Sequence, residues 1–211
     1  MYTPDHFTIT DPNEIRSIMA AYPLAMLIAP LSGVIEATPV PVVVDAPPPD
    51  PSGSLGALRY HLATANPLAH LEEGQEVLLT FMGPQAYVSP DWYATERLPP
   101  TWNYVTAQAR GRVSDLTPGE LRTLLDDLSA ANESQLPKPP WTADKMGEEL
   151  IARMLESIRG MRVSIDALEG KAKLSQNRSA RDRAGAAAAL AGLESLGSAH
   201  AVAAEMRKRS R

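Results

Sequence analysis

Apolar and polar residues alternate along several short stretches of the chain, and prolines, glycines and polar runs separate these stretches. A period of two residues over five or more positions is typical of a β-strand with one buried face. Pro39 and Pro41 cannot both donate to a central ladder, so we expect the second strand to be bulged or at an edge there. Gly111 indicates a bulge or a close backbone approach. The pattern predicts strands over residues 24–29, 34–44, 55–62, 75–81, 85–89, 101–116 and 161–168.

Helical spacing and capping residues fill the intervals between these strands. Asp11, Asn66 and Thr117 each stand where a helix N-cap is expected, and a proline follows each of them directly. We expect the first helix to end before Pro23 and the alanine-rich C-terminal part to be interrupted at Gly197. The predicted helices cover residues 12–22, 66–73, 118–131 and 144–159 and most of the chain after residue 178. Inward faces are expected at Leu121, Leu124, Leu125 and Leu128, and at Leu150, Met154, Leu155 and Ile158.

Strands with helices inserted between them, rather than in strict alternation, favour an antiparallel α+β barrel or sheet over a parallel βαβ fold. With 211 residues, the chain is long enough to bury a sizeable core in one domain with a helical appendage. The Pro-rich segment 46–54 is expected to form an exposed loop between strands.

Composition and charge narrow the classes of function. The absence of cysteine excludes disulfides and thiolate chemistry, and no targeting or membrane-spanning segment is evident, which predicts a soluble cytoplasmic protein. The net charge of −5 is unevenly placed, because residues 171–211 carry 9 Lys and Arg against 3 Asp and Glu. An anion is therefore expected to meet the C-terminal fifth of the chain.

The aromatic residues are concentrated between Phe81 and Val113. This segment holds two of the three tryptophans and three of the six tyrosines, interleaved with polar residues such as Ser89, Thr101 and Asn103. Such a mixture suits a surface that receives a flat, partly polar ligand, whereas a plain core uses aliphatic residues. The composition of this segment is compatible with core packing, a ligand cleft or a subunit interface. By itself it favours core packing or a subunit interface.

Familiar catalytic motifs are absent: there is no nucleophile elbow, no phosphate-binding loop, no dinucleotide fingerprint and no paired histidine helix. The four histidines lie far apart without metal-ligand spacing, so no metal site is predicted. Polar donors do gather at two predicted strand ends, residues 59–66 and 171–178. Lys, Ser, Gln, Asn and Arg are the donors that a phosphate or a carbonyl-edged heterocycle requires. The alternative to ligand binding is a solvated strand end for residues 171–178. For His61 the alternative is a structural histidine that forms a hydrogen bond.

Several of these segments together resemble the PaiB family of FMN-binding split-barrel proteins, usually described as negative transcriptional regulators. The resemblance spans residues 1 to about 190 and rests on long motifs rich in rare residues. The matching segments are Met1-Tyr-Thr-Pro-x-His-Phe7, His61-Leu-Ala-Thr-Ala-Asn-Pro67, Phe81 to Tyr93, Pro100-Thr-Trp-Asn-Tyr104 and Glu169 to Arg178. The chain departs from the family at Thr38-Pro39-Val40-Pro41, where a histidine usually follows the threonine.

The resemblance implies a small antiparallel split β-barrel of the pyridoxamine-phosphate-oxidase type, formed by residues 1–178, with peripheral helices and a helical segment 179–211. It also implies a homodimer with FMN held at the subunit interface. Combined with side-chain chemistry, it predicts that Lys173 and Arg178 neutralise the phosphate and that Trp102 or Tyr87 packs on the flavin ring. The full set of predicted cofactor-binding residues is Thr38, His61, Thr64, Asn66, Tyr87, Ser89, Thr101, Trp102, Asn103, Lys173, Gln176, Asn177 and Arg178.

Three functions follow as hypotheses. The first is a flavin-linked regulator, and the second is a flavin-dependent reductase or oxidase of a small molecule. The third is a DNA-binding repressor, whose phosphate contacts could come only from the basic end, Arg207-Lys208-Arg209-Ser210-Arg211, because residues 1–170 carry a net charge of −11. No catalytic residue is predicted.

Overall fold

The computed structural model describes residues 1–49, 53–193 and 197–209. These residues form two compact units, each built from segments that are distant in the sequence. Unit 1 comprises residues 1–18, 82–108 and 169–211, and unit 2 comprises residues 19–81 and 109–168. The domain boundary at residue 178 stays a prediction.

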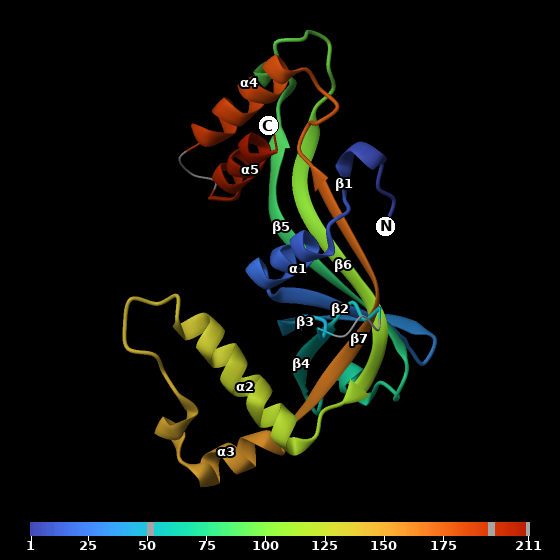
Figure 1. Ribbon diagram of the computed structural model, residues 1–211, viewed down its shortest axis with the longest axis vertical. Helices are drawn as coiled ribbons and strands as arrows, with labels where there is room; N and C mark the ends of the chain where they lie inside the picture. Colours follow the sequence, from blue (N-terminus) through green and yellow to red (C-terminus); the bar gives the residue numbers. More distant parts are fainter. Residues whose placement is uncertain (50–52, 194–196, 210–211) are drawn as a thin grey trace. The chain divides into compact units, whose positions relative to one another are not determined.

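One antiparallel sheet supplies the strands of both units (Figure 1). The strand order is β1-β7-β4-β3-β2-β5-β6, and a further pairing of β6 with β7 closes six of the strands into a ring. This closure is the topology of a β-barrel and confirms the predicted antiparallel α+β class. The strands are β1 (Thr8–Ile9), β2 (Leu24–Leu31), β3 (Val34–Asp45), β4 (Ala57–Ala63), β5 (Glu76–Val88), β6 (Thr101–Asp115) and β7 (Ile158–Lys173).

The β2–β3 hairpin shows how the chain accommodates its prolines. Ser32 and Gly33 both have positive φ angles, 51° and 82°, which matches the right-handed twist of the two strands that they join. Pro39 and Pro41 pair only with β2, because the ladder between β3 and β4 begins at Val42. The missing N–H groups therefore lie where β3 has one strand neighbour, which confirms the predicted edge.

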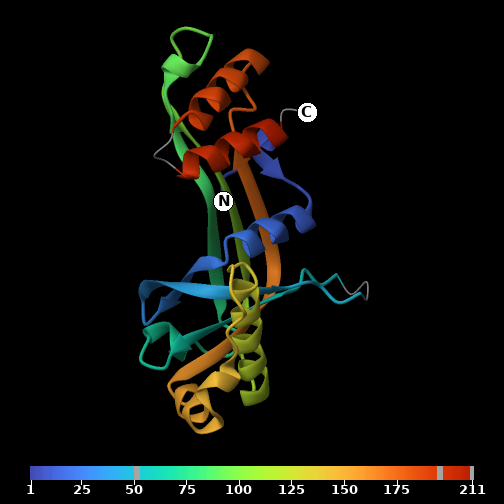
Figure 2. The ribbon, with the colours of Figure 1, turned by 90° about the vertical axis from the view of Figure 1, so that its left-hand side faces the viewer.

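The helices begin largely where the capping residues predict. Thr117 forms a complete capping box with Glu120, and the Asn66 side chain accepts a hydrogen bond from the Leu68 amide at 2.9 Å. In unit 1, α4 and α5 pack side by side, as both views show (Figures 1 and 2). The helices are α1 (Pro12–Ala21), α2 (Pro118–Glu133), α3 (Glu148–Leu155), α4 (Ala180–Ala191) and α5 (Gly197–Lys208). Short 3₁₀ turns cover Asp5–Phe7, Pro67–His70, Pro90–Trp92 and Ala143–Met146.

Several predictions of element bounds are wrong. The helix expected over residues 66–73 is only the 3₁₀ turn Pro67–His70. The two strands expected around Gly83-Pro84 are one strand, β5, because a proline φ angle is compatible with extended backbone. The helix expected over residues 144–159 is only α3, because Gly147 adopts a φ of 78° before it and β7 already begins at Ile158. Within α3, Ile151 is buried whereas Leu150 and Met154 are exposed. The last strand continues to Lys173 instead of ending at residue 168.

In the described part of the chain, no helix is long and apolar enough to cross a membrane.

Candidate functional site

The start of β6 and the end of β7 meet in unit 1 through one lysine. The Lys173 Nζ donates hydrogen bonds to the Thr101 Oγ1 and, at 2.6 Å, to the Trp102 carbonyl oxygen. Residues that are about 70 positions apart in the sequence are therefore joined at one polar strand end. Predicted cofactor-binding residues from two separate motifs are brought together here.

Three cations gather around this strand end: Lys171, Lys173 and Arg178. Lys171 lies 5.4 Å from the centre of the Tyr104 ring and donates to the Tyr2 carbonyl, and Arg178 lies 5.8 Å from the centre of the Tyr93 ring. Among the residues that the structure describes, none of the three cations forms an ion pair with a carboxylate. Burial lowers the pKa of Lys173, and repulsion from Lys171 and Arg178 lowers it further. An anion bound among the three charges would relieve this repulsion.

An exposed aromatic pair adjoins the Lys173 contact. Tyr87 on β5 and Trp102 on β6 pack edge to face, with ring centres 6.2 Å apart. Both side chains are about half exposed, 46% for Tyr87 and 54% for Trp102. The aromatic segment therefore does not simply fill a core in unit 1, because two of its largest rings lie at the surface.

A buried polar network holds the turn after β7. Ser175 has a positive φ of 63°, and its hydroxyl donates to the Asn103 Oδ1 at 3.2 Å and lies 3.3 Å from the Tyr93 hydroxyl. Asn103 is completely buried, and its amide also donates to the Met206 sulfur at 3.3 Å. Within the turn, the Gln176 Oε1 accepts from the Leu174 amide at 2.7 Å. These contacts fix the backbone from which Asn177 and Arg178 project.

The other predicted residue of this unit, Ser89, caps the short turn that leads to Tyr93 by accepting from the Asp91 amide. Sequence reasoning did not select Lys171, Ser175 or Tyr93 individually. Lys171 and Ser175 could have been found from the sequence, because both lie within the basic segment 171–178. Tyr93 was only part of the wider aromatic concentration.

Asp182, at the start of α4, connects the segment that follows β7 to the loop before β6 through hydrogen bonds. It accepts from the Thr95 amide at 2.8 Å, from the Thr95 hydroxyl at 2.9 Å and from the Ser179 hydroxyl at 2.7 Å. The hydrogen bond from Ser179, followed by those from Thr95, lowers the pKa of Asp182 to about 2. The carboxylate form is therefore required for this junction.

We expect Asp182→Asn to lower the Tm by about 5 °C at neutral pH, because the amide cannot accept all of these hydrogen bonds. A carboxyl whose folded pKa lies below its unfolded value, near about 4, stabilises the fold fully above that value. The difference between variant and parent should thus persist at pH 7 and vanish as the pH falls toward about 2. Circular dichroism melts across this range, with the exposed Asp91→Asn as control, provide the measurement. An unchanged Tm at pH 7 would contradict the assignment.

The remaining predicted residues lie in unit 2. The Asn66 amide donates to the Thr38 hydroxyl at 3.2 Å, which joins β3 to the segment after β4. The Thr64 hydroxyl and backbone amide both donate to the Ser157 carbonyl. His61 on β4 is half-buried, and burial lowers its pKa. It lines a cavity of about 380 Å³ that sequence reasoning did not predict.

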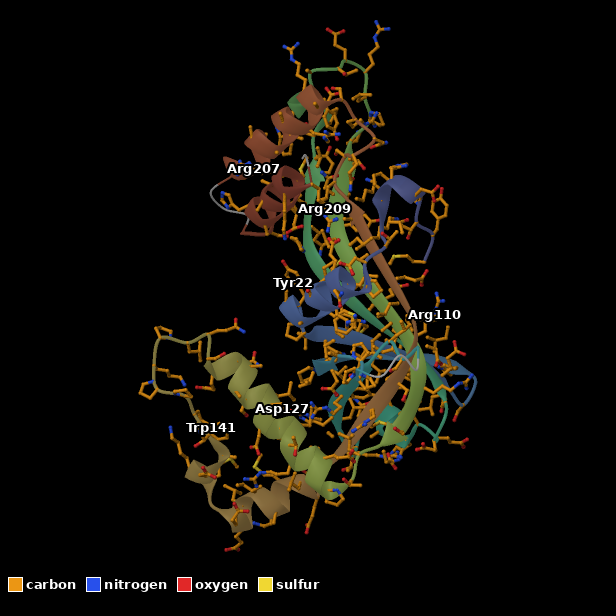
Figure 3. The ribbon with its side chains drawn as sticks, in the orientation of Figure 1. Tyr22, Arg110, Asp127, Trp141, Arg207 and Arg209 are labelled. Carbon is orange, nitrogen blue, oxygen red and sulfur yellow. The ribbon has the colours of Figure 1, made fainter. Side chains whose placement is uncertain are left out.

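The basic C-terminal end is largely neutralised by ion pairs. Arg209 pairs with Glu14 and Glu205, and Lys208 pairs with Glu205 at 3.4 Å. Arg207 is exposed (Figure 3). The Ser210 and Arg211 positions of the predicted phosphate-binding end lie outside the described residues.

The fold is that of the flavin-binding split barrels. The chain belongs to the PaiB family: the family model described as "Putative FMN-binding domain" matches residues 1–167. It is 30% identical to the protease synthase and sporulation protein PAI 2 of Bacillus subtilis, over 86% of this chain and 85% of that protein. It is also 34% identical to an uncharacterised protein of Emericella nidulans, over 80% of this chain and 79% of that protein.

Solved structures with this fold include flavoproteins. The FAD and heme binding protein from Mycobacterium smegmatis matches with a TM-score of 0.56 and 17% identity, over 84% of this chain and 78% of that one. The flavocytochrome Anf3 from Azotobacter vinelandii matches with a TM-score of 0.54 and 20% identity, over 84% of this chain and 75% of that one. At these identities the likeness concerns the fold.

Proposed function

We propose that this protein binds FMN at the unit 1 strand end and acts as a flavin-linked regulator. The observation that carries the proposal is a group of three cations that have no carboxylate partner among the described residues and lie beside an exposed aromatic pair. The cations suit a phosphate, and the Tyr87–Trp102 pair suits a flat ring. The family's FMN-binding description supports the choice of flavin.

The available donors fit the cofactor's chemistry. Lys173 retains one N–H after its two hydrogen bonds, and Arg178 presents a planar guanidinium that can bind a phosphate bidentately. Asn177 is exposed at the turn, and the Thr101 hydroxyl lies beside Lys173. Asn103 acts through the Ser175 turn, because its own side chain is completely buried. When bound, FMN would supply electron-transfer chemistry, while these residues supply binding and orientation.

The same aromatic surface supports the proposal of a homodimer with the flavin at its seam. Half-exposed Trp and Tyr side chains are enriched at protein interfaces, where they contribute large contact areas. A regulatory role is supported by the name of the Bacillus subtilis relative, which connects that protein with protease synthesis and sporulation. Direct DNA binding has less support, because ion pairs neutralise most of the described basic end.

Titration of FMN with the purified protein tests the binding. We expect saturable quenching of flavin fluorescence, with a stoichiometry of about one FMN per chain. A signal that does not saturate at high protein concentration would overturn the proposal. Oxidation of NAD(P)H by the FMN-loaded protein would favour the reductase alternative over a purely regulatory role.

We expect Trp102→Ala to raise the Kd for FMN about tenfold and to weaken the dimer, because one large ring serves both contacts. Fluorescence titration and sedimentation velocity measure the two effects. Tyr22→Ala, which removes an exposed aromatic side chain from unit 2, is the matched control and should change neither quantity (Figure 3). Wild-type values of both quantities in Trp102→Ala would exclude this surface as the flavin and dimer site.

A further inference from the structure

The C-terminal helix of unit 1, α5, buries few large apolar side chains. Where the structure describes burial in α5, the buried side chains are Ala199, Val202, Ala203 and Met206, and only two of these are larger than alanine. A helix of 12 residues is marginal in water unless its neighbours hold it, and a small buried area contributes little to this hold. Local release of α5 therefore costs less than unfolding of the whole unit.

Hydrogen bonds attach the first turn of α5 to strand β5. The Ser198 hydroxyl accepts from the Gln85 amide at 2.9 Å and donates to the Gln85 carbonyl at 2.6 Å. The ladder between β2 and β5 extends to Thr80, so Gln85 lies beyond it. Ser198 thus satisfies the backbone groups that a neighbouring strand would otherwise pair. Tyr87, one member of the exposed aromatic pair, follows two residues later on the same strand.

The last turn of α5 contacts the buried polar network of the turn after β7. The Asn103 Nδ2 donates to the Met206 Sδ at 3.3 Å, and the Asn103 Oδ1 accepts from the Ser175 hydroxyl at 3.2 Å. The residue before Asn103 is Trp102, whose carbonyl accepts from Lys173. One buried amide therefore connects α5 to both strands of the proposed flavin site.

Release of α5 would change this strand end. The Asn103 side chain is completely buried, so the N–H group that donates to Met206 would lose its acceptor. A buried donor without a partner is costly, so the strand end would have to rearrange as the helix leaves. A flavin that contacts Trp102 and Lys173 in their present arrangement would therefore favour the docked helix.

We propose that α5 is a regulatory element of the flavin site: bound flavin holds the helix docked, and an empty site favours its release. Asn103 is the positioning residue that couples the two events. This inference rests on the flavin binding proposed above. Release would also separate Arg209 from Glu14, with which it forms an ion pair, so flavin occupancy would control how far the basic end of the chain is neutralised.

Hydrogen exchange measured by mass spectrometry tests the coupling in the wild-type protein. We expect saturating FMN to slow exchange of the α5 amides about tenfold, more than it slows exchange in α2 of unit 2. Coupling between two sites is reciprocal, so a protein with α5 released should bind FMN more weakly by the same factor.

Two aspartate substitutions in α5 form a matched pair for this reciprocal effect. Val202→Asp places a charge in the buried contact of α5 and should release the helix. It should therefore raise the Kd for FMN about tenfold. Ala204→Asp adds the same charge on the exposed face of α5 and should leave the Kd for FMN within about twofold of the wild-type value. Equal losses of FMN affinity in the two variants would contradict the proposal.

Met206→Leu isolates the contact through Asn103. Leucine retains the apolar volume and removes the sulfur acceptor, so the helix stays docked while the coupling weakens. We expect saturating FMN to slow α5 exchange only about threefold in this variant. Slowing as large as in the wild-type protein would refute the role of Asn103.

The outcomes separate this coupling from the flavin proposal itself. Saturable FMN binding with unchanged exchange in α5 would overturn the coupling and leave the flavin proposal intact. Absence of FMN binding to the wild-type protein would overturn both. If Val202→Asp fails to fold, exchange in the wild-type and Met206→Leu proteins, with and without FMN, still decides the matter.

Discussion

Gly111→Ala is expected to lower the free energy of unfolding by about 4 kcal/mol, the largest stability effect that we expect from a single methyl group in this protein. Gly111 lies on β6, and a Cβ atom there would stand 2.0 Å from the Ser164 carbonyl oxygen and 2.7 Å from a Val163 methyl carbon. The Ser164 carbonyl belongs to the backbone of a paired strand, so it cannot move aside as the end of a flexible side chain can. The substitution would therefore force the β6 and β7 strands of unit 2 apart.

Urea denaturation followed by circular dichroism measures this change. Gly119→Ala is the matched control, because a Cβ at that position on α2 would meet no described heavy atom within 4 Å apart from its chain neighbours and the backbone of its own helix. We expect the control to be neutral or slightly stabilising, since alanine restricts the unfolded chain. A Gly111→Ala protein with the midpoint and slope of the parent would show that the two strands tolerate a wider spacing.

The features that sequence predicted best are those that short-range chemistry determines. The Ser32-Gly33 turn, the Thr117 capping box and the edge position of Pro39 each depend on a few adjacent residues with strong backbone preferences. Gly111 belongs with them, since a glycine within a strand pattern indicates close approach. The structure confirms that approach in its distance to Ser164.

Element bounds were predicted wrongly where pairing between distant strands outweighs the conformational preferences of a few adjacent residues. Gly83 and Pro84 are typical of a turn, yet β5 continues through both, with both residues buried. Similarly, Ile158 continues the helical spacing of α3, but it begins β7 and pairs with Ala63 of β4. Strand pairing of this kind joins residues that are distant in the sequence, so no local window contains it.

The candidate sites also combine features that adjacent residues indicate with features that depend on contacts between distant segments. The basic segment 171–178 and the aromatic concentration were visible as composition, whereas the contact of Lys173 with Trp102 requires the pairing of distant strands. The cavity beside His61 was not predicted, because its walls come from two helices whose packing the sequence does not specify. Its one predicted member, His61, had been interpreted either as a structural histidine or as a cofactor contact.

Lys173→Gln is expected to raise the Kd for FMN about 30-fold, equivalent to about 2 kcal/mol, because a charged hydrogen bond to the phosphate is lost. The affinity of the parent should also fall at high pH, as the lysine deprotonates, and its pKa is already lowered by burial and by Lys171 and Arg178. Fluorescence titration across a pH series measures both effects. Lys145→Gln, at an exposed lysine of unit 2, removes the same charge and should leave the Kd for FMN unchanged.

Riboflavin separates phosphate binding from a structural role of the lysine. It lacks the phosphate, so Lys173→Gln should leave its Kd within about twofold of the parent value if the lysine acts on that group. The same Nζ also holds the Trp102 carbonyl at 2.6 Å, and a loss of ring positioning would weaken FMN and riboflavin alike. Equal losses for both flavins would therefore assign Lys173 to the positioning of Trp102, and the phosphate contact would pass to Lys171 and Arg178.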